Sequence, residues 1–310
     1  MRWLSKVRRE PGWMVFGTGD EEFAAVLGEG GGAQPRVHQY AVRAMDGAEN
    51  GLLRAARDLN PKRFQCATLL DPNDYQIVVV DAPNVPQNEL KTAMRWRVKD
   101  MLDLHIDDVT LDVLDIPVPK DSPARNHTMY AVAGRNEAIQ NIIKRFEEAA
   151  IPLSVIDIPE TAQRNIATLY EAPGQALALI YFDNRGGLLT VNYEGELYLT
   201  RRLEPTFEQL THSYDSIRDD ARGRLSLELQ RSLDHFDRQF RSISIGKLLL
   251  GPEPSTSGLL EYLGTESGLP VAQIDLNEVI SIGGGPLEAR VQWRLFHLIG
   301  ASLRHEVKAL

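Results

Sequence analysis

Residues 176–202, ALALIYFDNRGGLLTVNYEGELYLTRR, contain three predicted strands joined by two turns. Ala176–Phe182 is a continuous apolar run, which is typical of a strand buried on both faces. The turn Asp183–Gly187 ends in two glycines that are free to adopt a positive φ, and Leu188–Tyr193 and Leu197–Leu203 then return as strands. An acidic residue after a buried strand, followed by a glycine pair, is a candidate phosphate-binding hairpin. The same pattern also occurs in hairpins that bind nothing, so the flanking sequence decides between the two interpretations.

Length and composition indicate a globular protein with two lobes. The chain has 310 residues, more than one core usually holds, of which 43% are hydrophobic and 25% are charged. A formal net charge of −9 argues against broad nucleic-acid binding, which relies on basic surface. Cys66 is the only cysteine, which excludes an internal disulfide and a thiolate-rich zinc site and suits a reducing cytoplasm. Since no apolar run reaches about 18 residues, we expect no membrane-spanning helix.

Other classes of site find little support. The basic N-terminus, MRWLSKVRREPGW, has cationic and apolar residues that suit an anionic membrane face, but a frayed basic tail is the simpler interpretation. The seven histidines are scattered and lack the helical spacing of a zinc site. Neither a G-x-S-x-G elbow nor a Walker A sequence is present.

The first part of the chain predicts an α/β layer with mixed strand pairing. Periodicity and turn residues mark its elements. The expected strands are Trp13–Gly17, Glu22–Gly28, Val37–Arg43, Cys66–Leu70, Gln76–Asp81 and Leu153–Ile158, and the expected helices are Ala48–Leu59 and Pro159–Glu171.

Residues 83–150 predict a compact inserted α+β subdomain of helix, strand, strand and helix. Its first helix, Gln87–Leu104, carries Lys91, Arg95 and Lys99 at four-residue spacing, with Trp96 beside them. A basic stripe next to a tryptophan, in an acidic protein, is a candidate docking surface for a partner segment. The alternative is a solvated face with the tryptophan packed on a neighbouring element.

The region after Pro173-Gly174 predicts a second lobe. After the opening hairpins we expect a helix over Thr206–Asp220, an interruption at Gly223, and a long amphipathic helix that ends near Ser242. A strand at Lys247–Leu250 and a closing helix around Val291–Arg304 follow.

Taken in order, these elements resemble the PilM group of actin-like proteins, which is related to the division protein FtsA. Within that group the pattern is most similar to the proteins of MSHA-type pilus biogenesis. The resemblance covers nearly the whole chain. It is carried by Val85–Leu90 with Trp96 and Asp100, Asp157–Ala162, the Asp183 hairpin with Leu199–Arg201, Glu228–Phe236, Lys247–Leu263 and Ile299–Arg304.

The resemblance implies an α/β, actin-like (ribonuclease H-like) fold of two lobes with a nucleotide cleft between them. The first lobe would comprise residues 1–82, continued by 151–173 and 290–310. The inserted subdomain would be 83–150 and the second lobe 174–289.

The resemblance also implies partners and a place in the cell. PilM-like proteins bind the short cytoplasmic N-terminal segment of a membrane-anchored, PilN-like pilus component and link the inner-membrane platform to the assembly ATPase. Related cytoplasmic domains occur in type II secretion. We therefore expect a cytoplasmic protein at the inner-membrane face that associates with the membrane through its partner, with the segment bound in the groove between the first lobe and the 83–150 subdomain.

A nucleotide site follows from the resemblance at six positions. In an active switch or ATPase, Asp183 would lie near a magnesium ion, and the glycines would give the nucleotide backbone room. The positions are Gly17, Gly19, Asp183, Gly186, Gly187 and Gly251.

The sequence departs from that pattern in two of its three loops. Phe16 stands where the family usually has an aspartate, and three carboxylates, Asp20–Glu22, follow it. A carboxylate about 4 Å from a phosphate charge costs about 4 kcal/mol at an effective dielectric constant of about 20. Pro252 and Pro254 remove amide donors from the adenosine-site turn. We therefore expect a pseudo-ATPase scaffold with no cofactor, and keep an ATP-binding switch as the alternative.

Overall fold

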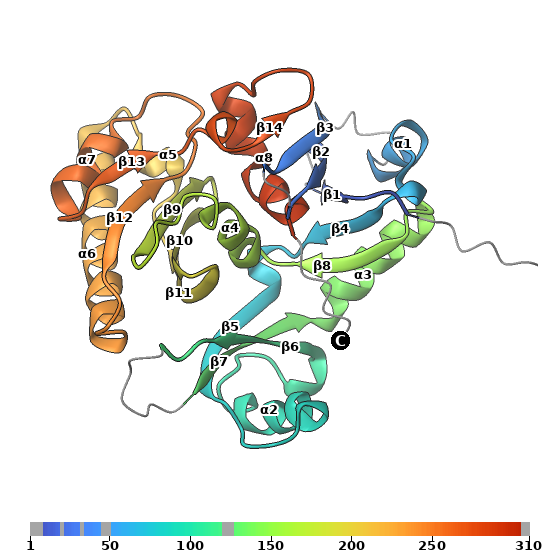
Figure 1. Cartoon of the computed structure of the whole chain (residues 1–310), viewed down its shortest axis with the longest axis horizontal. Coiled ribbons are helices and arrows are strands. Elements are labelled where there is room, and N and C mark those ends of the chain that lie inside the picture. Colours follow the sequence, from blue (N-terminus) through green and yellow to red (C-terminus); the bar gives the residue numbers. More distant parts are fainter. Residues whose placement is uncertain (1–8, 19–21, 32–33, 45–50, 120–126, 305–310) are drawn as a thin grey trace, which may run out of the picture.

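The structure is a computed structural model that describes residues 9–18, 22–31, 34–44, 51–119 and 127–304. Figure 1 shows two lobes side by side, with a smaller inserted subdomain below them and two helices between the lobes. No helix within these ranges is long and apolar enough to cross a membrane.

The first lobe is built on a six-stranded sheet. In their order across the sheet, the strands are β14 (Ser281–Ile282), β3 (Arg36–Ala44), β2 (Glu22–Glu29), β1 (Trp13–Thr18), β4 (Gln65–Leu69) and β8 (Leu153–Asp157). β1, β2 and β3 form an antiparallel meander, whereas β4 runs parallel to β1 and β8 runs parallel to β4. Helices α1 (Gly51–Asp58) and α3 (Asn136–Glu148) cover one face, where the Phe16 and Phe146 rings pack edge to face.

The second lobe repeats this topology in a five-stranded sheet. Its strands, in their order across the sheet, are β11 (Glu196–Leu203), β10 (Gly186–Tyr193), β9 (Ala176–Asp183), β12 (Ile245–Leu250) and β13 (Val271–Gln273). Here too an antiparallel meander is joined, through its first strand, to two parallel strands. Apart from β14, the two sheets therefore share one strand order. The predicted burial of Ala176–Phe182 on both faces is confirmed, because β9 is the central strand.

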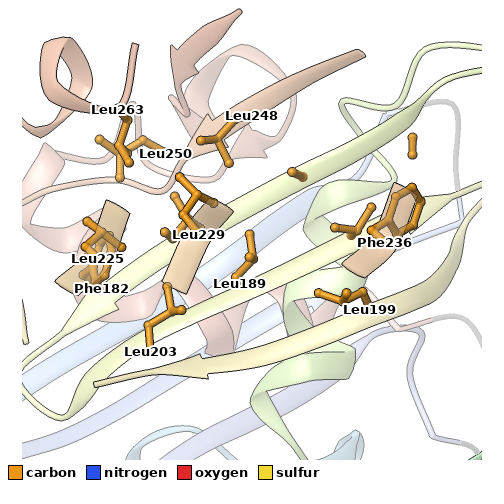
Figure 2. Packing of buried hydrophobic residues seen from close by; sticks show 14 of the residues in the cluster. Phe182, Leu189, Leu199, Leu203, Leu225, Leu229, Phe236, Leu248, Leu250 and Leu263 are labelled. Atoms are coloured by element: carbon orange, nitrogen blue, oxygen red, sulfur yellow. The ribbon is translucent and has the colours of Figure 1, made fainter. Parts of the chain in front are cut away.

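The core of the second lobe lies between this sheet and its helices. The helices are α5 (Phe207–Leu210), α6 (Asp215–Gln239) and α7 (Leu259–Glu266). Figure 2 shows Leu225, Leu229 and Phe236 of α6 in the same cluster as Leu189 and Leu199 of the sheet. Each such fully buried side chain contributes about 1.5–3 kcal/mol relative to an exposed one. This burial fixes α6 along the sheet.

The predicted interruption at Gly223 is wrong. Helix α6 continues from Asp215 to Gln239 without a break, and Gly223 lies exposed within it. A glycine in a helix interior costs about 1 kcal/mol relative to alanine. Burial of the apolar stripe of α6 outweighs that cost.

The inserted subdomain has a three-stranded antiparallel sheet with one helix on it. Its elements are β5 (Tyr75–Asp81), β7 (Thr128–Arg135) and β6 (Val109–Ile116), in that order across the sheet, and α2 (Leu90–Val98). Met94 and Val98 of α2 are buried against one face of the sheet. The predicted boundary after residue 82 therefore separates β5 from the strands with which it pairs.

Two other elements differ from the predicted domain ranges. Helix α3, which lies within 83–150, packs on the first lobe through Phe146. Strand β14, which lies within 174–289, pairs with β3 of the first lobe. These long-range pairings have no local sequence signal, because helix and strand patterns report only which face is apolar.

Helices α4 (Pro159–Ala167) and α8 (Ala289–Ser302) cross between the lobes. A Cβ atom on Gly300 would lie 2.1 Å from the Ala162 carbonyl oxygen, so the glycine permits this close crossing. The remaining helical turns of the described chain are 3₁₀ helices at Pro61–Arg63, Pro72–Asp74, Gln87–Glu89, Ile106–Asp108 and Leu276–Glu278.

Candidate functional site

The turn between β9 and β10 is closed by an internal ion pair. Oδ1 of Asp183 accepts a hydrogen bond from the backbone N–H of Arg185 at 2.8 Å, and Oδ2 accepts one from Arg185 Nη2 at 3.1 Å. Both oxygens of this carboxylate are therefore engaged by one residue of its own turn. A magnesium ion at Asp183 would have to compete with a guanidinium for the same oxygens.

The same arginine reaches the first lobe. Nη1 of Arg185 lies 2.7 Å from Oδ2 of Asp71, which follows β4 by two residues. Asp71 also accepts a hydrogen bond from the backbone N–H of Asn73 at the start of the next 3₁₀ turn. A cationic side chain thus bridges a carboxylate from each lobe, next to the predicted phosphate-binding hairpin.

Packing within the second lobe explains why the two hairpin positions are glycines. Gly186 has a φ of 134°, and a Cβ atom there would lie 2.6 Å from the Leu203 carbonyl oxygen. A Cβ atom on Gly187 would lie 2.5 Å from the ring of Phe182. The fold therefore requires both glycines whether or not a nucleotide binds.

Gly17 and Gly251 also lie against the chain itself. A Cβ atom on Gly17 would lie 3.0 Å from Leu298 of α8, and one on Gly251 would lie 2.9 Å from the ring of Tyr181. The predicted site residue Gly19 and the carboxylates at 20 and 21 lie outside the described residues. Phe16, where the resemblance implies an aspartate, is buried in the first-lobe core.

The turn after β12, where the resemblance implies an adenosine site, contains a buried carboxylate. Glu253 is 7% exposed and accepts hydrogen bonds from the Ser257 hydroxyl and, at 3.2 Å, from the Gln273 amide. Burial raises the pKa of this carboxyl above its usual range. Glu253, Glu261 and Asp275 line a cavity of about 500 Å³ beside α7. Three acidic side chains here disfavour a nucleotide, which is itself an anion.

Taken together, these groups fit Mg-ATP poorly. Asp183 is paired with Arg185, Pro252 has no N–H to donate, and the nearby cavity is acidic. Among the residues that the structure describes, no group of three or more histidine, cysteine, aspartate or glutamate side chains is arranged to hold a metal ion.

A polar group lies where α4, α8 and the second sheet meet. The amide nitrogen of Gln163 donates to the Leu179 and Leu188 carbonyls and to the Thr190 hydroxyl, all at 3.0–3.1 Å. Its amide oxygen lies 3.2 Å from Nε2 of His297. Burial, aided by the charges of two arginines, lowers the pKa of His297 to about 3. The imidazole is therefore neutral at physiological pH.

A second ionic junction joins the three parts of the molecule. Glu160 of α4 is 1% exposed; it accepts a hydrogen bond from the Tyr75 hydroxyl at 2.6 Å and one from Arg202 Nη2 at 2.6 Å. Tyr75 opens the subdomain sheet, and Arg202 lies on β11 of the second lobe. Tyr75 also lies four residues after Asp71, so the segment 71–75 is held by an arginine at each end.

The predicted basic stripe is largely engaged within the subdomain. Nζ of Lys91 lies 3.3 Å from Asp112, and Nη2 of Arg95 lies 3.0 Å from Asp107. Arg95 also donates to the Ile106 carbonyl, so it holds the loop before β6. Lys91 and Arg95 therefore stabilise the subdomain, whether or not they also bind a partner.

Trp96 differs from that pair. It is 71% exposed, and Nζ of Lys99 lies 5.5 Å from its ring centroid. Met101, half-exposed, follows at the end of the helix. The role of all four residues in partner binding stays a prediction.

The sequence predicts neither ionic junction. Arg185 lies in the predicted turn Asp183–Gly187, and Arg202 lies in the predicted strand Leu197–Leu203. Their partners Asp71 and Glu160 lie 114 and 42 residues away. An acidic residue directly before a proline turn, as at Asp71, was the available signal, and it indicates a cap rather than an ion pair.

Comparison with known proteins supports the fold. No family model matches the chain, and no curated protein matches it. A chain of the PilM–PilN type IV pilus biogenesis complex is 18% identical, with a TM-score of 0.68 over 96% of this chain and 98% of that one. The cytoplasmic domain of EpsL, an inner-membrane component of the Vibrio cholerae type II secretion system, is 11% identical, with a TM-score of 0.50 over 94% and 93%.

A Bacteroides thetaiotaomicron protein of unknown function, described as having an actin-like ATPase fold, is 6% identical with a TM-score of 0.47 over 91% of this chain and 96% of that one. In this chain the two sheets share one strand order apart from β14, and a helix crosses between the lobes after each. The chain has the α/β actin-like fold.

Proposed function

We propose that this chain is a non-catalytic actin-like scaffold of a type IV pilus assembly system. The observation that carries the proposal is the likeness, over almost the full length of both chains, to a chain of the PilM–PilN complex. In this function the protein binds a short cytoplasmic segment of a PilN-like inner-membrane component. It is cytoplasmic and reaches the membrane through that partner, and it also contacts the assembly ATPase.

The finer assignment, to an MSHA-type pilus and its MshI-like component, is supported by the sequence resemblance. The likeness to the EpsL cytoplasmic domain favours the same class of function, a cytoplasmic module attached to an inner-membrane assembly.

The non-catalytic part of the proposal is supported by the geometry at Asp183. Its two carboxylate oxygens are engaged by Arg185, so a guanidinium of the chain itself stands beside the residue that would face a metal. The hairpin glycines are accounted for by Phe182 and Leu203. An ATP-binding switch remains the alternative function.

Calorimetric titration of the purified chain with Mg-ATP separates the two functions. A scaffold gives no heat and no thermal shift at millimolar nucleotide. Micromolar binding would mean that Arg185 leaves Asp183 when nucleotide enters, and the switch would then be the better account.

A second titration tests the pilus assignment itself. The probe is a synthetic peptide of the cytoplasmic segment of the PilN-like component from the same source. Saturable binding with one-to-one stoichiometry is expected. Absence of binding to this segment would remove the pilus assignment and leave the fold unaffected.

A further inference from the structure

A groove of about 580 Å³ lies between the subdomain sheet and the second lobe. β11 of the second lobe lies against β6 of the subdomain sheet, and the groove follows this junction. It is separate from α2, which covers the opposite face of the subdomain sheet and carries the predicted docking residues.

One wall of the groove is apolar. Ile77 and Val79 of β5, Ile116 of β6 and Tyr130 of β7 line it. Val79 is 46% exposed and extends the apolar surface of this wall to solvent. Tyr130 is buried in this wall, and Thr200 of the edge strand β11 lines the groove with it.

The other wall is cationic. Arg201 and Arg202 of β11 line it, and His235 of α6 lies beside them. Arg202 forms an ion pair with Glu160, a carboxylate that also lines the groove. Arg201 is exposed, and its side chain has no hydrogen bond or ion pair with any described residue.

A guanidinium beside an apolar wall favours a ligand that carries both a carboxylate and aliphatic side chains. The chain as a whole carries a net charge of −9, yet this groove presents an unneutralised guanidinium next to exposed aliphatic surface. Guanidinium groups bind carboxylates in two-pronged hydrogen bonds, and an apolar wall binds aliphatic side chains. An extended segment whose side chains alternate would present both kinds of group at the required spacing.

We propose that this groove docks an extended, acidic segment of a protein partner, with a carboxylate on Arg201 and an aliphatic side chain against Ile77 and Val79. The proposal rests on the proposed function for the source of the segment, a cytoplasmic stretch of the membrane component. The exposed guanidinium of Arg201 and the apolar wall are observations on this chain alone.

The test uses the full chain and two fluorescein-labelled decapeptides, one alternating leucine with glutamate and one alternating leucine with glutamine. Fluorescence anisotropy measures binding to the wild type, to Arg201→Glu and to Arg36→Glu. Arg36 is an exposed arginine at the start of β3, remote from the groove, and provides the matched control. Because Arg201 has no described partner, its reversal leaves the fold intact, which circular dichroism checks.

The glutamate peptide is expected to bind the wild type and Arg36→Glu equally and Arg201→Glu about 10- to 100-fold more weakly. The glutamine peptide is expected to bind all three weakly, and added salt should weaken the glutamate complex. Equal binding of the glutamate peptide to the wild type and Arg201→Glu overturns the proposal. Equal binding of both peptides to the wild type overturns the requirement for a carboxylate.

The synthetic cytoplasmic segment of the PilN-like component then separates the two proposals. Binding that Arg201→Glu weakens supports both. Binding that Arg201→Glu leaves unchanged retains the proposed function and overturns the groove as its site. If the glutamate decapeptide depends on Arg201 but the cytoplasmic segment does not bind, the proposed function fails and the groove stands.

Discussion

The guanidinium of Arg185 lies 2.7 Å from the carboxylate of Asp71 and so joins the two lobes at the predicted phosphate-binding hairpin. The two side chains are 54% and 42% exposed, so water and salt reach the pair. An actin-like nucleotide site would place a metal and phosphates near this hairpin. Here the chain supplies a cation of its own between the lobes.

The Arg185–Asp71 pair is expected to contribute little to global stability. Exposed ion pairs contribute about 0.2–1 kcal/mol in double-mutant cycles. We expect that coupling energy between Arg185→Ala and Asp71→Asn in urea unfolding, decreasing as salt is added. The Arg43–Asp58 pair, with similar exposure but within one lobe, is the control. Amide hydrogen exchange at the β9–β10 turn should be faster in Arg185→Ala than in the wild type and unchanged in Arg43→Ala. Equal exchange in the two variants would show that Arg185 does not stabilise this turn.

Arg202 is expected to matter far more than its neighbour Arg201. Arg202→Leu leaves the 1% exposed Glu160 carboxylate without its cation. Loss of one partner of a buried pair costs about 3–5 kcal/mol, but Arg202 is 42% exposed, so we expect a loss of about 1–3 kcal/mol. Arg201→Leu, on the same strand and without a described partner, should change the free energy of unfolding by less than about 0.5 kcal/mol. If the two substitutions lowered the free energy of unfolding in urea equally, the Arg202–Glu160 ion pair would not be a stabilising junction.

His297 is expected to make stability depend on pH in acid. Its folded pKa is lowered to about 3, against about 6.5 in an unfolded chain. Between these values the unfolded chain binds a proton that the folded chain does not, so stability falls as pH falls from about 6.5 towards 3. The slope is at most about 1.4 kcal/mol per pH unit.

His297→Gln should remove this slope, whatever its effect on stability at neutral pH. The difference in unfolding free energy between the wild type and the variant, measured from pH 7.5 to about 4.5, isolates the contribution of the histidine. The exposed His235, changed to glutamine, is the matched control. A wild-type slope that survives in His297→Gln would assign the acid sensitivity to other groups.

Gly187→Ala is expected to destabilise the chain in the absence of any nucleotide. The new Cβ atom would lie 2.5 Å from the ring of Phe182, which is itself 3% exposed in the second-lobe core. Overpacking of this kind costs about 1–3 kcal/mol. Gly223→Ala, in α6 with nothing within 4 Å of the new atom, should instead stabilise the chain by up to about 1 kcal/mol. Thermal unfolding of the ligand-free variants measures the change in melting temperature for each substitution. An unchanged melting temperature for Gly187→Ala would indicate that the Phe182 ring moves aside freely.

Local patterns predicted the individual elements well where one face is clearly apolar. The hairpins after Ala176 and the amphipathic face of α6 were predicted, because alternation and helical spacing record directly which side chains are buried. The predicted helix interruption at Gly223 is wrong because the helix preference of one residue changes the free energy by about 1 kcal/mol, less than the burial of a single leucine.

The domain boundaries illustrate a different limit. The sequence predicts β5 as a strand, yet its pairing with β7 rather than with the first-lobe sheet depends on residues 47–59 positions away. An apolar strand has the same sequence pattern in either sheet. The hydrogen-bonded register that decides between them exists only in the folded chain.

The sequence by itself determined the class of the protein. Its apolar runs and turn residues predict the strands and hairpins, because these patterns depend on neighbours in the chain, and the resemblance of its ordered segments implies the actin-like fold. Tertiary structure decided the chemistry of the candidate sites. It brought Arg185 to Asp71, left Arg201 without a described partner in a groove and placed Glu160 under Arg202. The reason is physical: the charge state and accessibility of a side chain depend on which groups surround it, and those groups come from distant parts of the chain.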